Sequence, residues 1–222
     1  MTAGPVRPRV CNGAVSVRGE TLAGARLAAG LIRVARRHGD AQDHAALLEE
    51  HGLGGPDALP VRERLVLAGR LSRWAGRLRP VFAADGPRDR ADAVAALLEA
   101  VPIRALLSAS AGHETSPVWR FTAASADGSG SLDDVLGQVQ ATTAGALAWL
   151  VVDGEGDRLG LCGLPGCRAA FVDERDRGRR RRFCSDRCRA AAAVRTHRDR
   201  AWLREHGGGS PATEGCAGMG PR

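Results

Sequence analysis

The chain has 222 residues, which is enough for one substantial domain and a smaller second one. Its 44% hydrophobic and 26% charged residues are typical of a folded, soluble protein. The longest apolar run, at 144–152, is too short to cross a bilayer, and residues 1–10 lack the apolar core of a secretory signal. We therefore expect a cytoplasmic protein with no membrane partner, whose cysteines bind metal or remain free thiols.

Positive charge is concentrated near the C-terminus. The formal net charge is +7, and all 32 basic residues are arginines. Residues 158–204 contain 14 arginines and 5 acidic residues, whereas the rest of the chain has 18 arginines and 20 acidic residues. A local excess of this kind is the electrostatic footprint of a nucleic-acid-binding element.

The first 150 residues predict a mainly helical domain with one pair of strands. Apolar residues spaced three and four apart indicate helices at 21–38, 40–50, 60–82 and 87–100. Pro80 should bend or end the third of these helices. Two strands are expected at 103–107 and 118–122, followed by a helix at 132–150 that Ser131 caps.

These elements predict an α+β fold in three parts. Residues 10–153 form the helical domain, residues 158–204 form a small cysteine-containing module, and the Gly-, Ser- and Pro-rich residues 207–222 form a disordered tail. The stripe of Leu67, Leu71 and Trp74 on the third helix suits either a homodimer interface or the domain core, and the core is the commoner use of such a stripe.

Four of the six cysteines form two closely spaced pairs, which are Cys162 with Cys167 and Cys184 with Cys188. Zinc binds four thiolates tetrahedrally, and a sphere filled by four protein ligands leaves no position for water. The spacing therefore predicts one structural zinc ion, whose binding supplies much of the folding energy of so small a module. An iron–sulfur cluster and four unrelated thiols are the alternatives.

The residues around the second pair predict the local fold of the module. We expect a hairpin between 169–173 and 180–183 with its turn near Gly178, and then a helix capped by Ser185 that extends to Trp202. Cys184 and Cys188 would lie on one face of the first turn of this helix. A cysteine knuckle, a hairpin and a ligand-bearing helix together make a treble-clef-like module.

Three features of the module resemble a known family. They are Phe171 and Asp173 after the second cysteine, the sequence Arg181-Arg182-Phe183-Cys184-Ser185, and the basic segment 194–198. In these positions the stretch 162–198 resembles the zinc-finger module called CGNR, which is found in bacterial regulators behind a helical domain called ABATE. The chain departs from the family at 189–191, where Arg-Ala-Ala stands in place of Gly-Asn-Arg. No predicted metal ligand is changed there, but a contact made by the family's asparagine or arginine would be missing.

The resemblance extends upstream, through the order and length of the helices, to about residue 10. It implies a bacterial transcription regulator that responds to stress. In such a regulator the ABATE-like domain senses a small-molecule effector or a protein partner, and the zinc module binds DNA.

Seven arginines are the candidate nucleic-acid contacts. We expect the hairpin residues to contact phosphates and the helix residues to approach a groove; they are Arg179, Arg180, Arg181 and Arg182 on the hairpin and Arg187, Arg195 and Arg198 on the helix. Sequence-specific RNA recognition usually needs exposed aromatic side chains, and Phe171 and Phe183 are expected to pack beneath the zinc. DNA is therefore favoured over RNA, and a merely solvated basic surface is the remaining alternative.

We interpret the chain as a zinc-finger DNA-binding protein and transcription regulator. No pairing of a nucleophile with a base is recognisable in the sequence, so we expect no enzymatic activity. The alternatives are an RNA-binding accessory protein and an adaptor in which zinc stabilises a protein-docking surface.

Overall fold

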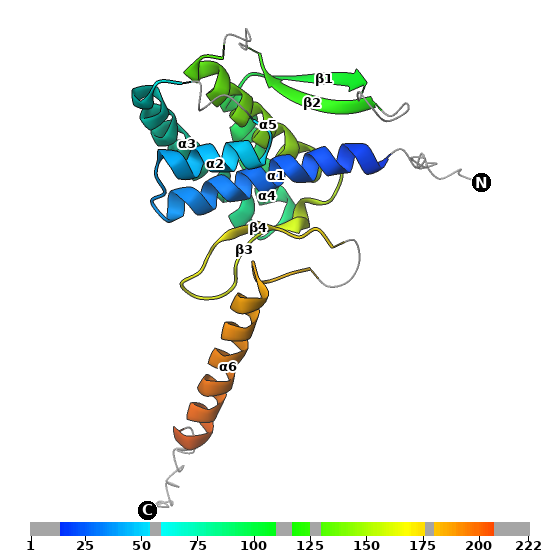
Figure 1. Cartoon of the computed structure of the whole chain (residues 1–222). Helices are drawn as coiled ribbons and strands as arrows, with labels where there is room; N and C mark the ends of the chain where they lie inside the picture. The colour runs from blue at the N-terminus through cyan, green and yellow to red at the C-terminus, as the bar shows by residue number, and fades with distance from the viewer. Residues whose placement is uncertain (1–13, 54–58, 110–116, 125–129, 176–179, 207–222) are drawn as a thin grey trace, which may run out of the picture.

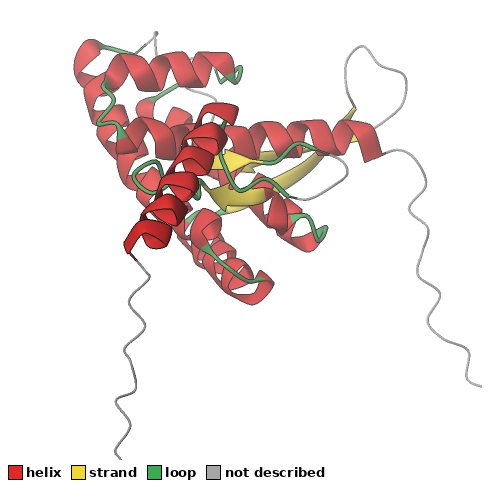
Figure 2. Cartoon of the chain, turned by 90° about the horizontal axis from the view of Figure 1, so that it is seen from below, coloured by secondary structure: helices red, strands yellow, loops and turns green. Residues whose placement is uncertain are grey.

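The computed structural model describes residues 14–53, 59–109, 117–124, 130–175 and 180–206 (Figure 1). The elements in chain order are α1 (Ala14–Arg36), α2 (Ala41–Glu50), α3 (Val61–Ala83), α4 (Pro87–Ala100), β1 (Ile103–Ala109), β2 (Pro117–Ala123), α5 (Leu132–Val152), the 3₁₀ turn η2 (Gly156–Arg158), β3 (Leu159–Leu161), β4 (Ala170–Val172) and α6 (Asp186–His206). This is the α+β, mainly helical fold that the sequence predicts, with every expected helix present. Figure 2 shows how the helices dominate and how small the strand pairs are. The expected tail at 207–222 lies outside the described residues.

Helix α5 lies at the centre of the helical body. Ser131 begins it by accepting a hydrogen bond from the backbone N–H of Asp134, and Val139, Leu147 and Leu150 are buried along its length. Among the described residues, α5 is the one helix long and apolar enough to cross a membrane. Its packing against α1, α3, α4 and β2 accounts for that composition, because a helix covered on several sides is apolar around most of its circumference.

The stripe on α3 belongs to the core. Leu67, Leu71 and Trp74 are all buried, and they join one hydrophobic cluster with residues of α1, α4 and α5. Pro80 does not stop α3, which continues to Ala83. The guanidinium of the buried Arg90 then covers the helix end, where it donates to the carbonyl of Val81 at 3.3 Å and to that of Ala84 at 2.6 Å.

The first strand pair packs on α5. β1 and β2 are antiparallel, in a register that places Ile103 opposite Ala123 and Ala109 opposite Pro117. The ring of Phe121 lies against Gly145 of α5, where a Cβ atom would overlap the ring. The glycine therefore allows the hairpin to approach the helix closely.

The second strand pair shares the core of the helical body. β3 and β4 are antiparallel, with Leu159 opposite Val172, and Leu159, Ala170 and Val172 belong to the same buried cluster as the helices. Both strands pack on α3, and β4 also packs on α1. Helix α6, in contrast, projects away from the body (Figure 1), and it lies in front of the body when the molecule is viewed from below (Figure 2).

The interior hydrogen bond between α3 and α5 gives a test of this packing. Trp74 Nε1 donates to Thr143 Oγ1 at 3.0 Å, and the same hydroxyl donates to the carbonyl of Val139 at 2.7 Å. Thr143→Val keeps the shape but leaves the indole N–H unpaired, so we expect a loss of about 1–3 kcal/mol in urea-induced unfolding. Thr196→Val on exposed α6 removes a similar bond to a helix carbonyl and should change stability little. Equal effects of the two substitutions would contradict the buried pairing.

Candidate metal centre

Four sulfur atoms meet at one point, as the spacing predicts. The Sγ atoms of Cys162, Cys167, Cys184 and Cys188 all lie within 4.8 Å of one another. The distance from Cys167 to Cys184 is 3.7 Å, from Cys184 to Cys188 it is 3.6 Å, and from Cys188 to Cys167 it is 3.7 Å. A tetrahedral zinc ion with bonds of about 2.3 Å requires sulfur–sulfur separations of about 3.8 Å. The sulfur positions therefore fit one zinc ion, and four protein ligands make the site a structural one.

The first two ligands are held by the β3–β4 hairpin. Cys162 follows β3 and Cys167 precedes β4, and the backbone N–H of Cys162 donates to the carbonyl of Ala169 at 2.8 Å. Between them the chain makes a tight turn in which the N–H of Cys167 donates to the carbonyl of Leu164. Gly166 has φ of 86°, a left-handed conformation that favours glycine. The turn brings both sulfurs to the same side.

The other two ligands lie at the start of α6. Cys188 is in the first turn of the helix, and its N–H donates to the Ser185 hydroxyl at 3.2 Å, which confirms Ser185 as the capping residue. Cys184 precedes the helix instead of lying on its first turn as expected. The backbone N–H of Gly163 donates to the carbonyl of Arg182 at 2.8 Å and so joins this segment to the first pair of ligands.

The expected hairpin between 169–173 and 180–183 is wrong. β4 pairs with β3, which precedes Cys162, and the described residues 180–183 form no strand. The backbone N–H of Arg181 instead donates to the carboxylate of Asp173 at 2.8 Å. The hairpin therefore flanks the cysteine knuckle instead of following it. Gly178 and Arg179 lie outside the described residues.

The four thiols differ in their environments. Burial, together with contacts from the other cysteines, raises the pKa of Cys184 to about 12, and burial also raises the pKa of Cys167. The hydrogen bond from Ser185 lowers the pKa of Cys188. Zinc binds the thiolate form, so metal binding at neutral pH must displace protons from these thiols.

A network of buried charges supports the hairpin from behind. The guanidinium of Arg158 is 1% exposed. It donates to both carboxylate oxygens of Glu155 at 2.7 and 2.8 Å and to the carbonyls of Asp173 and Arg175 at 2.9 and 3.0 Å. Arg158 was not singled out from the sequence, because nothing in the local pattern distinguishes it from the other arginines of the module.

Asp173 connects the two halves of the module. Its carboxylate accepts two hydrogen bonds of 2.9 Å from the guanidinium of Arg175 and one from the backbone N–H of Arg181. The Arg175 bonds hold the pKa of Asp173 well below its usual range, although burial acts in the opposite direction. The acidic position noted in the sequence is therefore a structural anchor for the segment that leads to Cys184.

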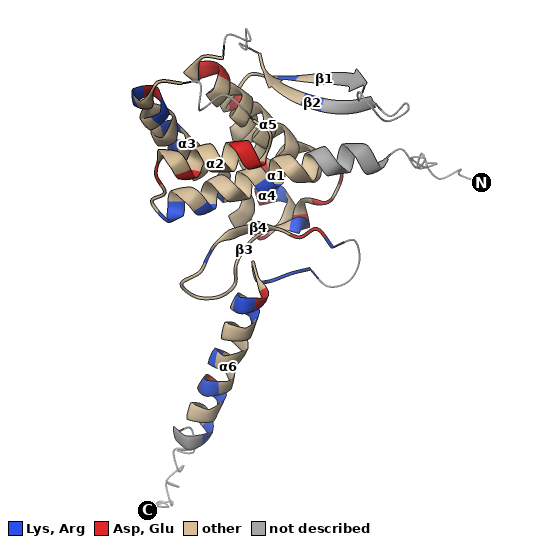
Figure 3. Ribbon diagram, viewed as in Figure 1, with Lys and Arg blue, Asp and Glu red and all other residues tan. Residues whose placement is uncertain are grey.

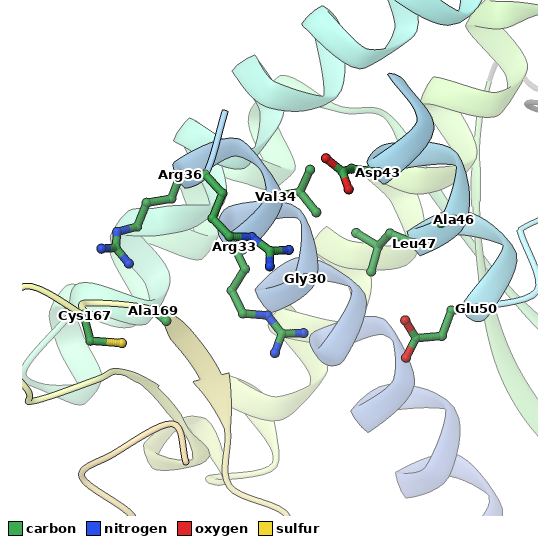
Figure 4. Close-up of a pocket in the computed structure, with 11 residues that line it drawn as sticks. Gly30, Arg33, Val34, Arg36, Asp43, Ala46, Leu47, Glu50, Cys167 and Ala169 are labelled. Atoms are coloured by element: carbon green, nitrogen blue, oxygen red, sulfur yellow. The ribbon is translucent and has the colours of Figure 1, made fainter. Parts of the chain in front are cut away.

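The module also contacts α1 directly. The guanidinium of Arg36 donates to the carbonyl of Gly166 at 2.7 Å, and Arg26 forms an ion pair with Glu174 at 3.4 Å. A cleft of about 600 Å³ lies beside the knuckle. In Figure 4 Arg33 of α1 points towards the side of the cleft where Asp43 and Glu50 of α2 lie, whereas Arg36 turns towards the knuckle. The last turn of α1 thus adds positive charge next to the metal centre.

The candidate nucleic-acid arginines fall into two groups. Three contact the protein itself: Arg180 pairs with Asp157 at 2.8 Å, Arg181 donates to the carbonyl of Cys184 and lies 6.0 Å from the Phe171 ring, and Arg182 lies 5.9 Å from the Phe183 ring. The three on α6, in contrast, are exposed; they are Arg187, Arg195 and Arg198. Figure 3 shows the arginines distributed along this helix.

Metal analysis tests the site directly. We expect about one zinc per chain after purification without chelator, and Cys184→Ser should retain much less of it, because three thiolates with water in the fourth position bind zinc more weakly than four thiolates. Cys216→Ser is the matched control, since Cys216 belongs to neither of the two cysteine pairs in the sequence, and it should retain the metal. Full zinc occupancy in Cys184→Ser would contradict the assignment of ligands.

The Asp173 anchor gives a prediction about pH. Its folded-state pKa lies below the unfolded value of about 3.9, so its contribution to stability is present above pH 4 and is lost as the pH falls through the folded value. Asp173→Asn should therefore cost about 2 kcal/mol at pH 7, and this difference from the wild type should shrink below pH 4. Acid also releases zinc, but it does so from both proteins. The difference between their free energies of unfolding, measured by chemical denaturation at each pH, therefore reports the contribution of the Asp173 carboxylate. A difference independent of pH would contradict the ionic role.

Comparison with known proteins agrees with this geometry. No curated protein is significantly similar to the chain. The family model described as CGNR zinc finger matches residues 158–201, a range that begins at the buried Arg158 and contains all four cysteines.

Proposed function

We propose that the protein is a DNA-binding transcription regulator whose zinc module presents α6 to duplex DNA. The observation that carries this proposal is the position of α6, an exposed arginine-rich helix fixed at one end by the metal centre and projecting from the body (Figures 1 and 3). The local excess of positive charge around the module supports it.

The composition of α6 is unusual for a helix with a structural role. Nearly all its described side chains are exposed, and it has no apolar face turned towards the core. A helix that is polar on all sides gains little from packing and needs another source of stability or a partner. Zinc binding by Cys188 anchors the first turn, and a helix of 21 residues extends about 30 Å from that point. This length suits insertion in a major groove, which accommodates one α-helix.

The helical repeat separates the arginines of α6 into two faces. Arg187, Arg195 and Arg198 lie on one face together with Trp202, which is 59% exposed. Arg189, Arg200 and Arg204 lie on the opposite face, and Arg189 pairs with Asp186 at 3.1 Å. We assign the first face to DNA, because its guanidinium groups can reach both base edges and phosphates.

The arginines before α6 take a secondary part in this proposal. Arg180 and Arg181 already make contacts within the module, so their main contribution to DNA binding is positive potential beside the helix. Arg182 is exposed and adds a phosphate contact at the base of the helix. Arg179 is assigned to the same role from the sequence alone.

The regulatory part of the proposal rests on the resemblance to CGNR modules that follow an ABATE domain. In this interpretation α1 to α5 form the sensing domain of a bacterial cytoplasmic regulator, and the metal has no catalytic task. The Arg189-Ala190-Ala191 segment in place of Gly-Asn-Arg leaves the metal site complete, and it removes side chains that would contribute to target recognition in the family.

RNA binding is the second candidate, and exposed apolar groups favour it. Trp202 and Val194 are 59% and 53% exposed on α6, and an accessible indole can stack on an unpaired base. The same two side chains would serve a protein partner if α6 were a docking helix.

Binding measurements on the zinc-loaded protein distinguish these functions. We expect fluorescence anisotropy to detect binding to a random-sequence duplex at low salt, with an affinity that falls steeply as salt rises. Changing Arg187, Arg195 and Arg198 together to Gln should reduce the magnitude of the slope of log K against log salt by about 2–3. Each phosphate contact that is lost reduces the number of counterions released on binding by about one.

The matched control is the triple change of Arg189, Arg200 and Arg204 to Gln, which removes the same charge from the same helix. A smaller effect of this control supports the assigned face, whereas equal effects would contradict it. Absence of duplex binding at low salt would contradict DNA binding altogether, and a preference for single-stranded RNA that is lost in Trp202→Ala would favour the second candidate.

A further inference from the structure

A second concave site lies on the helical body, and none of the four cysteines lines it. A cavity of about 400 Å³ opens between α1, α5, β2 and the residues that follow α2. This volume lies within the usual range for small-molecule pockets. Its lining residues are Thr21, Ala23, Gly24, Leu27, His51, Leu53, Arg120, Phe121, Thr122, Gln138, Thr142 and Ala146.

About half of the lining is apolar. Leu27, Leu53 and Phe121 supply the larger side chains, and Gly24 and Ala146 supply the wall where α1 and α5 meet. A Cβ atom on Gly24 would lie 2.6 Å from the Cβ of Ala146, so the two helices are already in contact there. The cavity is therefore bounded by packed elements of the core, and its apolar walls suit a compact apolar group.

Two polar side chains of the other walls, Arg120 and His51, make no side-chain hydrogen bond with another described residue. The Arg120 guanidinium forms no ion pair with any described residue, and the His51 ring makes no hydrogen bond within that part of the chain. Gln138 donates both amide hydrogens, to the carbonyl of Phe121 at 2.9 Å and to Thr142 Oγ1 at 3.0 Å, which fixes its side chain. No acidic residue lines the cavity.

The positive charge of Arg120 and the hydrogen-bonding ring of His51 favour a negatively charged ligand. Arg120 is exposed, and it would repel a cation because no carboxylate lines the cavity to balance the charge. A carboxylate accepts two parallel hydrogen bonds from a guanidinium. Burial lowers the pKa of His51, so at neutral pH its uncharged ring can donate a further hydrogen bond.

We propose that this cavity binds a small organic monocarboxylate, with Arg120 pairing with the carboxylate and with the apolar body of the ligand lying against Leu27, Phe121 and Ala146. His51 orients the ligand through a hydrogen bond to the carboxylate, and Gln138, whose amide hydrogens are both bonded within the protein, keeps this wall in place. A polyphosphate does not fit this arrangement, because a single arginine would balance only part of its charge.

The same site lies next to the zinc module. His51 also lines a neighbouring cavity of about 490 Å³, together with Arg26, Phe171 and Cys184. Arg26 forms the ion pair with Glu174, and its charge also acts on His51, so a ligand at His51 lies close to a contact between α1 and the module. An effect of the ligand on DNA affinity rests on the proposed function, whereas binding of the carboxylate does not.

Titration of the zinc-loaded chain with benzoate, hexanoate and 2-naphthoate tests the proposal. We expect at least one of them to bind with a dissociation constant below about 1 mM by calorimetry, and 2-naphthamide, which lacks the charge, to bind at least tenfold more weakly. In ¹⁵N-resolved spectra the largest shifts should fall at His51, Thr122 and Thr142. Absence of binding by all three carboxylates, or equal binding of the amide, would overturn the proposal.

The variant Arg120→Gln should weaken carboxylate binding at least tenfold with no change in zinc content. Arg104→Gln is the matched control, because Arg104 is an exposed arginine on β1, opposite Thr122 in the hairpin, and does not line the cavity. Equal losses in the two variants, or largest shifts outside the cavity, would overturn the proposal. The measurements contain no DNA, so their failure is distinct from a failure of DNA binding.

Discussion

The convergence of four thiols on one metal position is the constraint on which the C-terminal part of the molecule depends. β3 and β4 have three residues each, too few to hold a module together by themselves. Cys162 and Cys167 belong to a hairpin that is part of the hydrophobic core, whereas Cys184 and Cys188 belong to the start of α6. A zinc ion bound by all four therefore joins the projecting helix to the core, and the direction of α6 follows from its first turn.

Two buried charged residues hold together parts of the module that the short strands do not reach. Arg158 and Asp173 are both buried, and each is surrounded by hydrogen-bonding groups of opposite charge or by carbonyls and N–H groups. A buried charge is tolerated only with such partners, and the removal of one partner is costly. The network thus fixes the described residues 173–175 and 180–183, which form no strand and whose backbone groups need other partners.

Helix α1 connects the cavity of the body with the zinc module. Its residues line the cavity that we propose binds a carboxylate, its last turn contacts the cysteine knuckle through Arg36, and Arg26 reaches Glu174. Figure 1 shows this helix crossing the body between the β1–β2 hairpin and the zinc module. Coupling between two sites needs an element that both ligands influence, and α1 is the element in contact with both regions.

The sequence by itself determined the helices, the strand pair β1–β2 and the set of metal ligands. Two of these signals are local and can be recognised without knowledge of distant residues. They are the helical pattern over 87–100 and the spacing of Cys162, Cys167, Cys184 and Cys188. Only the tertiary structure determined that β4 pairs with β3, that Arg158 is buried, and which arginines remain exposed on α6. These outcomes depend on groups far apart in the chain, as in the contact of Arg36 with Gly166, and a local pattern carries no information about such partners.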